Sequence, residues 1–328
     1  MLYSNDWCRL EYLQDLINIH VDITEEDIHR VNCLSLNEIK KNAVEKAYKV
    51  VGNNPVICLS GGIDSQALLN IWHEQGLPYT AVTFDFGNNF NSQELNDALK
   101  FAEFLKIPVK VIKLDVMRFL LRDLPTFFEK FNIISPQFAV HAYFLENIKA
   151  MGYTGAVLGG NGFVVEENSV FFNLSDAQLL DIERYGINSK FNVLPSFLSF
   201  DKDLCIALAI ETLIISRDPD PENPFFKLVY DPIIKSLVSN VDVSKKERYN
   251  SKIKSYQNLG CQLIPQDIKK TGFEEIKKFY NDQNNNEWAF EREFRLPRRY
   301  KIPESKVNTI IDSNVEKTIL EVSKKLNS

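Results

Sequence analysis

The chain has 328 residues, of which 45% are hydrophobic and 25% charged, an ordinary composition for a globular protein. Its formal net charge of −6 argues against a chain-wide electrostatic attraction to nucleic acid or to an anionic membrane surface, and only a local basic patch would bind either one. Five scattered cysteines without a Cys-x-x-Cys pair, no signal peptide and no apolar run of about 18 residues favour a cytoplasmic protein outside the membrane, without a zinc or disulfide framework.

Residues 1–35 mix aromatic and acidic side chains and are expected to form a short N-terminal arm. Within them, residues 22–27 are typical of a helix start, because acidic residues are stabilised near the positive end of a helix dipole. A second helix is predicted over residues 36–51, with Ser35 as its N-cap and Glu38 as the partner in a capping box.

The next stretch joins a strand to a helix through a glycine turn. Residues 56–59 are apolar and predict a buried strand, residues 60–65 read Ser-Gly-Gly-Ile-Asp-Ser, and a helical pattern follows over 66–76. This arrangement gathers backbone N–H groups and the positive end of a helix dipole at one point, which favours phosphate binding. Gly61 and Gly62 let the backbone approach a phosphate without an intervening Cβ atom.

The polar side chains of this turn also have predicted roles. The hydroxyls of Ser60 and Ser65 are hydrogen-bond donors for a phosphate. Asp64 would repel a phosphate directly, because both are anionic. It fits either as the N-cap of the following helix or as a ligand of a Mg²⁺ ion that bridges phosphates.

Strands and helices then alternate along the chain. Strands are predicted over residues 79–84 and 109–114, and a helix over 92–106 lies between them. Short connections between such elements indicate an α/β fold with a doubly wound parallel sheet. Ligands of these sheets bind at the carboxyl ends of the strands, so Phe84 and Asp85 are predicted to contact a nucleotide there.

Two further helices are predicted over residues 119–132 and 137–151, the second of which contains His141. In this apolar pattern a histidine of the core or of a groove is favoured over a catalytic base. An apolar strand over 155–158 ends in the glycine-rich residues 159–162. Glycines at that place fit two interpretations, a close approach of the backbone to a ligand or a hairpin turn.

The Ser-Gly-Gly-Ile-Asp-Ser turn at residues 60–65 resembles the pyrophosphate-binding loop of the PP-loop ATP pyrophosphatases. That superfamily includes asparagine, β-lactam, GMP, NAD and argininosuccinate synthetases and tRNA-modifying ligases. The resemblance implies an adenine nucleotide α-hydrolase-like fold, ATP cleaved between its α and β phosphates, and Mg²⁺ as cofactor. A chance Gly-Gly turn between a strand and a helix is the alternative interpretation.

A second stretch resembles one branch of this superfamily in particular, the synthetase domain of asparagine synthetase. Residues 157–162, Val-Leu-Gly-Gly-Asn-Gly, are similar to the Val-Leu-Ser-Gly-Glu-Gly of that branch. The similarity implies that Gly159 and Gly160 line the ATP site, with Gly159 standing where the branch has serine. It extends over roughly residues 50–165.

The same comparison puts the predicted metal site in doubt. In the asparagine synthetase branch an acid after the glycines binds Mg²⁺, whereas Val164 stands at that position here. Glu166 and Glu167 lie two and three residues later and are candidate substitutes, unless they form a solvated turn. Asp64 is therefore the favoured metal ligand.

The C-terminal third is less informative. Residues 36–235 are expected to form the synthetase domain, including a buried helix over 204–215, and residues 236–328 a helical, basic region. In that region Lys269 and Lys270, within Lys-Lys-Thr-Gly-Phe-Glu, resemble a segment of viral asparagine-synthase-like proteins, and a catalytic contact of both with pyrophosphate is predicted.

A cluster of basic residues follows near the C-terminus. Its members are Arg292, Arg295, Arg298, Arg299 and Lys301. Arginines interleaved with aromatic residues can bind nucleic acid, but neighbouring glutamates favour a solvated, ion-paired surface. A nucleic-acid partner is therefore not favoured.

The predicted function is an AMP- and pyrophosphate-forming ligase that adenylates a carboxylate or amide oxygen of a small-molecule acceptor. Ammonia or another nucleophile would then attack the adenylate. Glutamine-dependent synthetases carry an N-terminal nucleophilic cysteine, but residue 2 is leucine here, so the amine is expected from solution or from a partner. The alternatives are a nucleotide-binding module without catalysis and a ligase that modifies tRNA or a nucleobase. The oligomeric state stays open.

Overall fold

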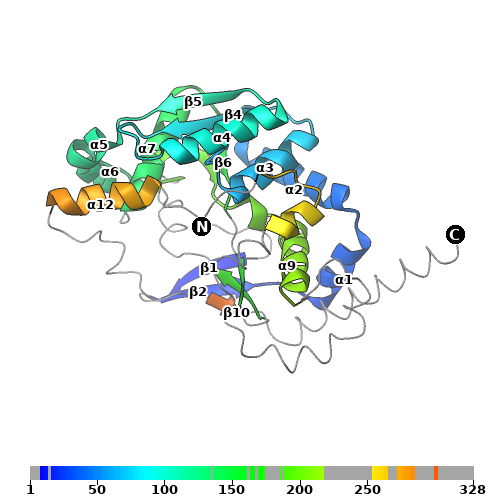
Figure 1. Ribbon diagram of the computed structural model, residues 1–328. Helices are drawn as coiled ribbons and strands as arrows, with labels where there is room; N and C mark the ends of the chain where they lie inside the picture. The colour runs from blue at the N-terminus through cyan, green and yellow to red at the C-terminus, as the bar shows by residue number, and fades with distance from the viewer. Residues whose placement is uncertain are drawn as a thin grey trace, which may run out of the picture.

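The centre of the fold is a five-stranded parallel sheet in the order β5-β4-β3-β6-β9 (Figure 1). The computed structural model describes residues 8–13, 16–133, 136–160, 163–166, 169–173, 185–186, 188–217, 253–264, 272–284 and 299–301. The strands of this sheet are β3 (Pro55–Cys58), β4 (Thr80–Asp85), β5 (Val109–Lys113), β6 (Gly155–Leu158) and β9 (Asn192–Leu194). The chain runs outward from β3 to β5 and returns on the other side of β3, which confirms the predicted doubly wound α/β fold.

Helices cover both faces of this sheet, because alternate strand residues point to opposite sides. Ile57 belongs to a core formed with α2 (Leu36–Val51), α3 (Ile63–Glu74), α4 (Ser92–Leu105) and α9 (Lys202–Arg217). Val56 and Cys58 belong to a second core, formed with α5 (Val116–Arg118), α6 (Leu124–Phe131) and α7 (Pro136–Ala150). Both cores are dominated by buried aliphatic and aromatic side chains.

The helix predicted over residues 119–132 is interrupted in the structure. A π-helical turn, Phe119–Asp123, joins α5 to α6, and Pro125 lies in the first turn of α6. Proline has no N–H to donate and its ring crowds the carbonyl of the preceding turn, so a regular helix does not continue through it.

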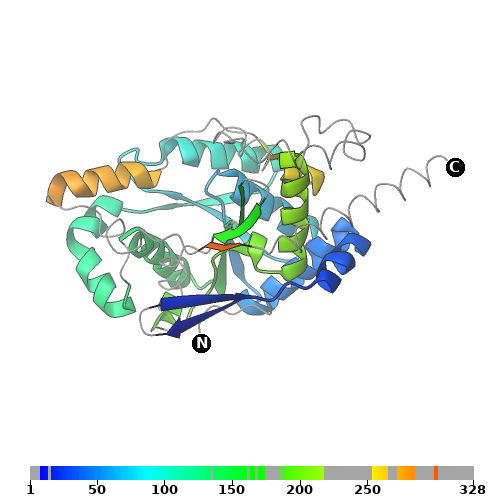
Figure 2. The same ribbon diagram turned by 90° about the horizontal axis from the view of Figure 1, so that it is seen from below.

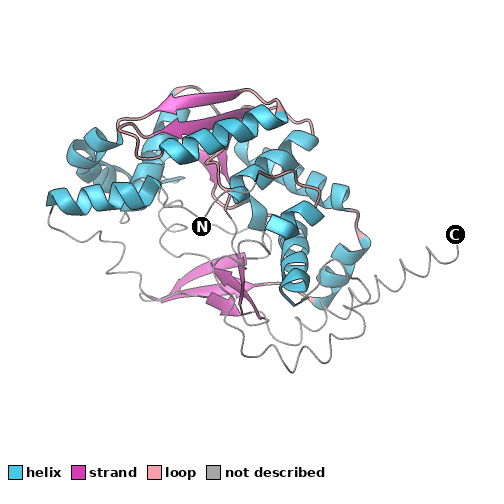
Figure 3. Cartoon of the chain, in the orientation of Figure 1, coloured by secondary structure: helices cyan, strands magenta, loops and turns pink. Residues whose placement is uncertain are grey.

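Small antiparallel sheets lie apart from the main sheet (Figure 3). One is a hairpin of β1 (Cys8–Leu13) and β2 (Leu16–Val21), within the predicted N-terminal arm. The other has the order β10-β8-β7, formed by β7 (Phe163–Glu166), β8 (Ser169–Asn173) and β10 (Arg299–Lys301). None of these five strands was predicted from the sequence.

The structure describes two further helices. The predicted start near residues 22–27 is confirmed in α1 (Glu25–Cys33), which has a capping box between Thr24 and Asp27. At the opposite end, α12 (Gly272–Asn284) lies beside α5 and α6 (Figures 1 and 2). The predicted domain boundaries stay a prediction.

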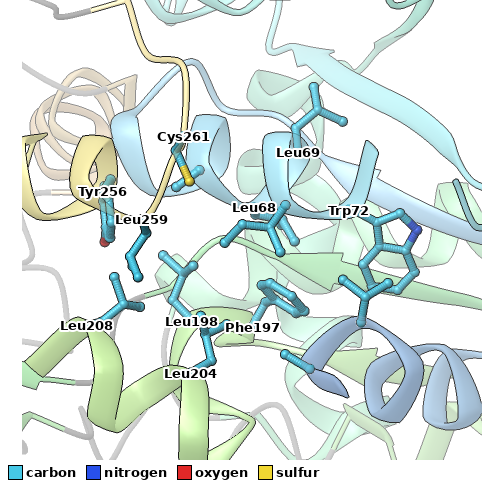
Figure 4. Packing of buried hydrophobic residues seen from close by; sticks show 14 of the residues in the cluster. Leu68, Leu69, Trp72, Phe197, Leu198, Leu204, Leu208, Tyr256, Leu259 and Cys261 are labelled. Carbon is cyan, nitrogen blue, oxygen red and sulfur yellow. The ribbon is translucent and has the colours of Figure 1, made fainter. Parts of the chain in front are cut away.

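Residues 253–264, here called the strap, pack along α3 although they lie far from it in the sequence. Their helical turn, 253–258, is followed by an extended stretch, 261–264. Figure 4 shows Tyr256, Leu259 and Cys261 of the strap beside α3 and above Leu208 of α9. All four side chains belong to the core on the α2–α4 face of the sheet.

Two buried amides on α3 hold the backbone of the strap. Gln66 Nε2 donates to the carbonyl of Ile264 (3.1 Å), and its Oε1 accepts from the Ile264 N–H (2.8 Å). Asn70, one helical turn later, forms the same pair of contacts with Gln262. Each side-chain amide thus pairs with the backbone N–H and C=O of one strap residue, as a neighbouring strand would. These backbone groups and the amides therefore have hydrogen-bonding partners in the protein interior.

We expect Asn70→Ala to lower the free energy of unfolding by about 1–3 kcal/mol, because it leaves the backbone N–H and C=O of Gln262 without their partner. Denaturant unfolding measures this difference. The matched control is Asn147→Ala on α7, where the half-buried amide donates to the carbonyl of Tyr143 in its own helix (2.8 Å). The control should change stability by less than about 0.5 kcal/mol. Equal effects of the two substitutions would contradict the anchoring role of Asn70.

Candidate phosphate-binding site

The glycine turn lies at the point where the strand order of the main sheet reverses. It follows β3, and the glycines after residue 158 follow β6, which is paired with β3 in parallel. In open α/β sheets the crevice at such a reversal, outside the carboxyl ends of the strands, is where ligands bind. The structure therefore brings together the two glycine-rich stretches that the sequence indicated separately.

Helix α3 begins directly inside the turn, three residues earlier than predicted. Gly62 is its N-cap and provides no side-chain cap hydrogen bond. The N-cap of α3 thus contributes no side-chain acceptor at the positive end of the helix dipole. This arrangement favours an anionic ligand at that end. This geometry agrees with the predicted phosphate contact.

The two serines of the turn have different roles. Ser65 is buried, and its hydroxyl donates to the Gly62 carbonyl (2.8 Å) while accepting from the Ser60 N–H (3.1 Å). Because its proton is used inside the turn, Ser65 stabilises the turn in this conformation, and its predicted contact with a phosphate stays a prediction. The hydroxyl of Ser60 donates to Ser65 Oγ (3.1 Å), but Ser60 is exposed, so this hydroxyl can rotate towards a ligand.

The two adjacent glycines are needed for different reasons. Gly61 has φ +88°, and a Cβ atom there would lie 2.5 Å from the Glu94 carbonyl oxygen of α4. Gly62 has φ −66°, and the nearest atom to its Cβ position would be Ser60 Oγ at 3.5 Å. Gly61 is therefore required by backbone conformation and by packing on α4, whereas the space beside Gly62 is open to a ligand.

The glycines after β6 are also explained by close packing. A Cβ atom at Gly159 would lie 2.6 Å from Cα of Ser65, and one at Gly160 would lie 2.5 Å from Oγ of Ser196. These glycines let β6 approach the start of α3 on one side and the chain after β9 on the other. The structure gives this packing as one reason for Gly159 and Gly160. Their predicted contact with ATP stays a prediction, and so does the hairpin turn, because residues 161–162 lie outside the described residues.

Asp64 is not the N-cap of α3, which corrects one of its two predicted roles. It is the second residue of the helix, because Gly62 occupies the cap position. An acid in the first turn is still favourable beside the positive end of the dipole. Asp64 is half-buried, and its Oδ1 accepts a hydrogen bond from the hydroxyl of Tyr256 in the strap (2.6 Å).

The carboxyl end of β4 is held by local hydrogen bonds. Asn91 accepts from the N–H of Phe86 (2.9 Å) and donates to the carbonyl of Phe84 (2.7 Å). Asp85 Oδ1 accepts from the Gly87 N–H (2.9 Å), which closes a tight turn. Phe84 also stacks on Phe144 of α7, with 4.6 Å between ring centroids. The predicted nucleotide contacts of Phe84 and Asp85 stay predictions.

His141 lies among aromatic rings on α7, 5.8 Å from the ring of Phe138 and 5.9 Å from that of Phe144 between centroids. Burial lowers the pKa of His141 to about 4. Its imidazole is therefore neutral near pH 7 and a weak base. This supports the interpretation of His141 as a histidine of the core.

The candidate metal ligands are only partly described. Among the residues with described side chains, no group of three or more His, Cys, Asp or Glu residues could hold a metal ion by itself. Glu166 is in β7, but its side chain is not described, and Glu167, Lys269 and Lys270 lie outside the described residues. Asp64 at the helix start, beside the open position at Gly62, fits one carboxylate ligand of a Mg²⁺ ion whose other ligands are phosphate oxygens and water.

The structure adds residues that the sequence analysis missed, namely Gln66, Asn70 and Tyr256. The signal for Gln66 and Asn70 was present, because they lie one helical turn apart and are the two polar residues within 66–72 of α3. Buried amides imply a hydrogen-bonding partner. The partner itself lies 192 to 198 residues away, which no local pattern indicates.

One family model, described as queuosine biosynthesis protein QueC, matches residues 54–126. The matched range includes the glycine turn and strands β3 to β5, although it covers less than half of the chain. It supports the resemblance to the PP-loop ATP pyrophosphatases over that range. No curated protein matches the chain significantly.

Solved structures show more distant likenesses. NMN synthetase from Francisella tularensis is 18% identical, with 75% of this chain and 99% of that chain covered and a TM-score of 0.31. NH3-dependent NAD synthetase from Campylobacter jejuni is 15% identical, with coverages of 76% and 100% and a TM-score of 0.30. U34-tRNA thiolase NcsA from Methanococcus maripaludis is 16% identical, with coverages of 81% and 91% and a TM-score of 0.35. Likenesses of this size define no activity for the chain.

Within the described part of the chain, no helix is long and apolar enough to cross a membrane. The cytoplasmic location indicated by the cysteine usage stays a prediction. The nature of the partners also stays a prediction.

The difference between the two glycines of the turn predicts different effects of substitution. Gly61→Ala should lower the free energy of unfolding by more than about 2 kcal/mol, because it adds a Cβ at positive φ against the α4 backbone. Gly62→Ala should change it by less than about 1 kcal/mol. Thermal or denaturant unfolding measures both, and similar losses at the two positions would refute the assignment.

The open position at Gly62 predicts a specific loss of nucleotide binding. Gly62→Val should keep a native far-UV circular dichroism spectrum, because its backbone angles suit any residue. The affinity for ATP should fall more than about tenfold, since the branched side chain occupies the expected phosphate position. Equilibrium titration with ATP and Mg²⁺ measures this, and wild-type affinity in the variant would remove the phosphate site from the turn.

Proposed function

We propose that the protein is an ATP-dependent ligase of the PP-loop ATP pyrophosphatase type, which forms AMP and pyrophosphate. The observation that carries this proposal is the turn Ser60–Ser65, with its open position at Gly62, at the reversal point of a parallel sheet. The match of residues 54–126 to the QueC model supports it, because the matched range contains this turn.

In this proposal the turn binds the β and γ phosphates of ATP. The backbone N–H groups at the start of α3 donate to phosphate oxygens, and the exposed hydroxyl of Ser60 adds a side-chain donor. Asp64 provides a ligand for Mg²⁺, with Glu166 and Glu167 as further candidate ligands. When bound, Mg²⁺ neutralises charge on the phosphates. Lys269 and Lys270 are proposed as additional cations for the pyrophosphate that leaves.

The proposed reaction has two steps. A carboxylate or amide oxygen of the acceptor forms a bond to the α phosphorus of ATP, while the bond from that phosphorus to the bridging oxygen breaks and pyrophosphate leaves. Ammonia or another amine then attacks the activated carbon, and AMP leaves with the oxygen. Positioning and charge neutralisation account for most of the catalysis, so a general base such as His141 is not required.

The acceptor defines two candidate functions. A small-molecule acceptor with ammonia or an amine supplied from solution or a partner corresponds to the resemblance to asparagine synthetase. The match to a queuosine biosynthesis family favours a second candidate, in which the acceptor is a nucleobase or a nucleobase precursor. Both candidates use the same adenylating chemistry at the turn.

We expect ATP turnover with a productive acceptor to yield AMP and pyrophosphate in equal amounts, because attack at the α phosphorus releases both. Chromatography of the nucleotides with an enzymatic pyrophosphate assay measures the products, first with carboxylic acids plus ammonia and then with nucleobases or tRNA. The Gly62→Val variant is the control and should be inactive. ADP and orthophosphate as products would exclude the proposed reaction, and nucleotide binding without turnover across acceptors would leave a binding module.

A further inference from the structure

A buried tyrosine from the strap touches the acid proposed to bind metal. The side chain of Tyr256 is fully buried, and its hydroxyl donates to Oδ1 of Asp64 over 2.6 Å. The two residues are 192 positions apart in the sequence. This short contact to a carboxylate belongs to the stronger class of hydrogen bonds, because the acceptor is charged.

The position of the tyrosine is fixed by contacts that do not involve Asp64. Gln66 and Asn70 hold the backbone of the strap after Tyr256 through their side-chain amides. Leu259 and Cys261 are buried in the same core as α3. The phenol is therefore presented to Asp64 by a segment that is already anchored, so little conformational freedom is lost when the hydrogen bond forms.

A second anchor lies under the turn of the strap. Lys40 of α2 is buried and forms an ion pair with Glu74 at the end of α3. The Cβ position of Gly260 lies 3.5 Å from the Lys40 ammonium, and Gly260 has φ +82°. The strap thus contacts α3 at Asp64, Gln66 and Asn70, and its turn lies beside Lys40, the ion-pair partner of Glu74.

We infer that Tyr256 is a positioning residue for Asp64, a role that rests on the proposed function. A carboxylate has two oxygens, and a hydrogen bond that holds Oδ1 fixes the plane of the group and hence the direction of Oδ2. Partners behind a metal ligand orient it and tune its affinity in this way. The strap then determines how well the first turn of α3 binds a nucleotide-associated Mg²⁺ ion.

The direct test is Tyr256→Phe, which removes the hydroxyl and retains the ring in its packing. Binding of α,β-methylene ATP, which cannot be cleaved at the α phosphate, is measured by calorimetry over a series of Mg²⁺ concentrations. The Mg²⁺ concentration for half-maximal binding should rise roughly 10- to 100-fold. At saturating Mg²⁺, the nucleotide affinity should stay within about threefold of wild type, because the backbone donors of the turn are unchanged.

The chain offers a matched control in Tyr185. Its side chain is also fully buried, and its hydroxyl also contacts a carboxylate, Oε1 of Glu146 at 3.1 Å, on the other face of the sheet. Tyr185→Phe should leave the Mg²⁺ dependence at the wild-type value. Thermal unfolding of both variants is recorded in parallel, so that titrations are done on folded protein.

A double-substitution cycle with Asp64→Asn separates positioning from packing. If Tyr256 acts through Asp64, adding Tyr256→Phe to Asp64→Asn should change the Mg²⁺ dependence less than about twofold. Independent effects in the double variant, or a Tyr256→Phe protein that melts earlier but keeps wild-type Mg²⁺ dependence, would overturn the inference. Wild-type protein that binds no nucleotide at any Mg²⁺ concentration would instead overturn the proposed function and this role with it.

Discussion

The candidate site depends on backbone atoms packed so closely that no Cβ atom fits between them. Gly159 at the end of β6 lies against Ser65 of α3, and Gly61 lies against the backbone of α4. A side chain at either position would push α3 away from the sheet or change the conformation of the turn. These two contacts therefore fix where α3 begins, and they direct its positive end to the reversal point between β3 and β6.

The strap extends this arrangement along α3 from Asp64 to Asn70. A helix that is buried on nearly all sides needs apolar neighbours for its aliphatic residues and hydrogen-bonding partners for its polar ones. The strap provides both, since Leu259 joins the core while its backbone at Gln262 and Ile264 pairs with side-chain amides of α3. The site is consequently assembled from two distant parts of the chain, and the metal ligand proposed in α3 contacts a residue of the second part.

Much of the central fold could be predicted because local signals are strong there. The capping box of Ser35 and Glu38, the apolar strand before the turn, and the alternation of strands and helices are all present in the structure. The hairpin β1–β2 was missed although residues 8–12 and 17–21 alternate between apolar and polar side chains, a pattern that is typical of a half-buried strand.

The chemistry of the site was predicted less completely, for a physical reason. A single sequence shows that Gly61 and Gly159 are glycines but not which atoms approach them, so close packing and ligand contact look alike. The position of Asp64 within α3 was also not predictable, because it depends on the backbone angles of Gly62, which make Gly62 the N-cap of the helix. Tyr256 was missed because contacts between residues 192 positions apart leave no local pattern.

The proposed binding of nucleotide phosphates by the first turn of α3 can be tested by a crystal structure of the protein with Mg²⁺ and α,β-methylene ATP. We expect β- and γ-phosphate oxygens within hydrogen-bonding distance of the backbone N–H groups that follow Gly62, and Mg²⁺ bound to Asp64. A triphosphate bound elsewhere on the molecule, with the space beside Gly62 filled only by water, would contradict it.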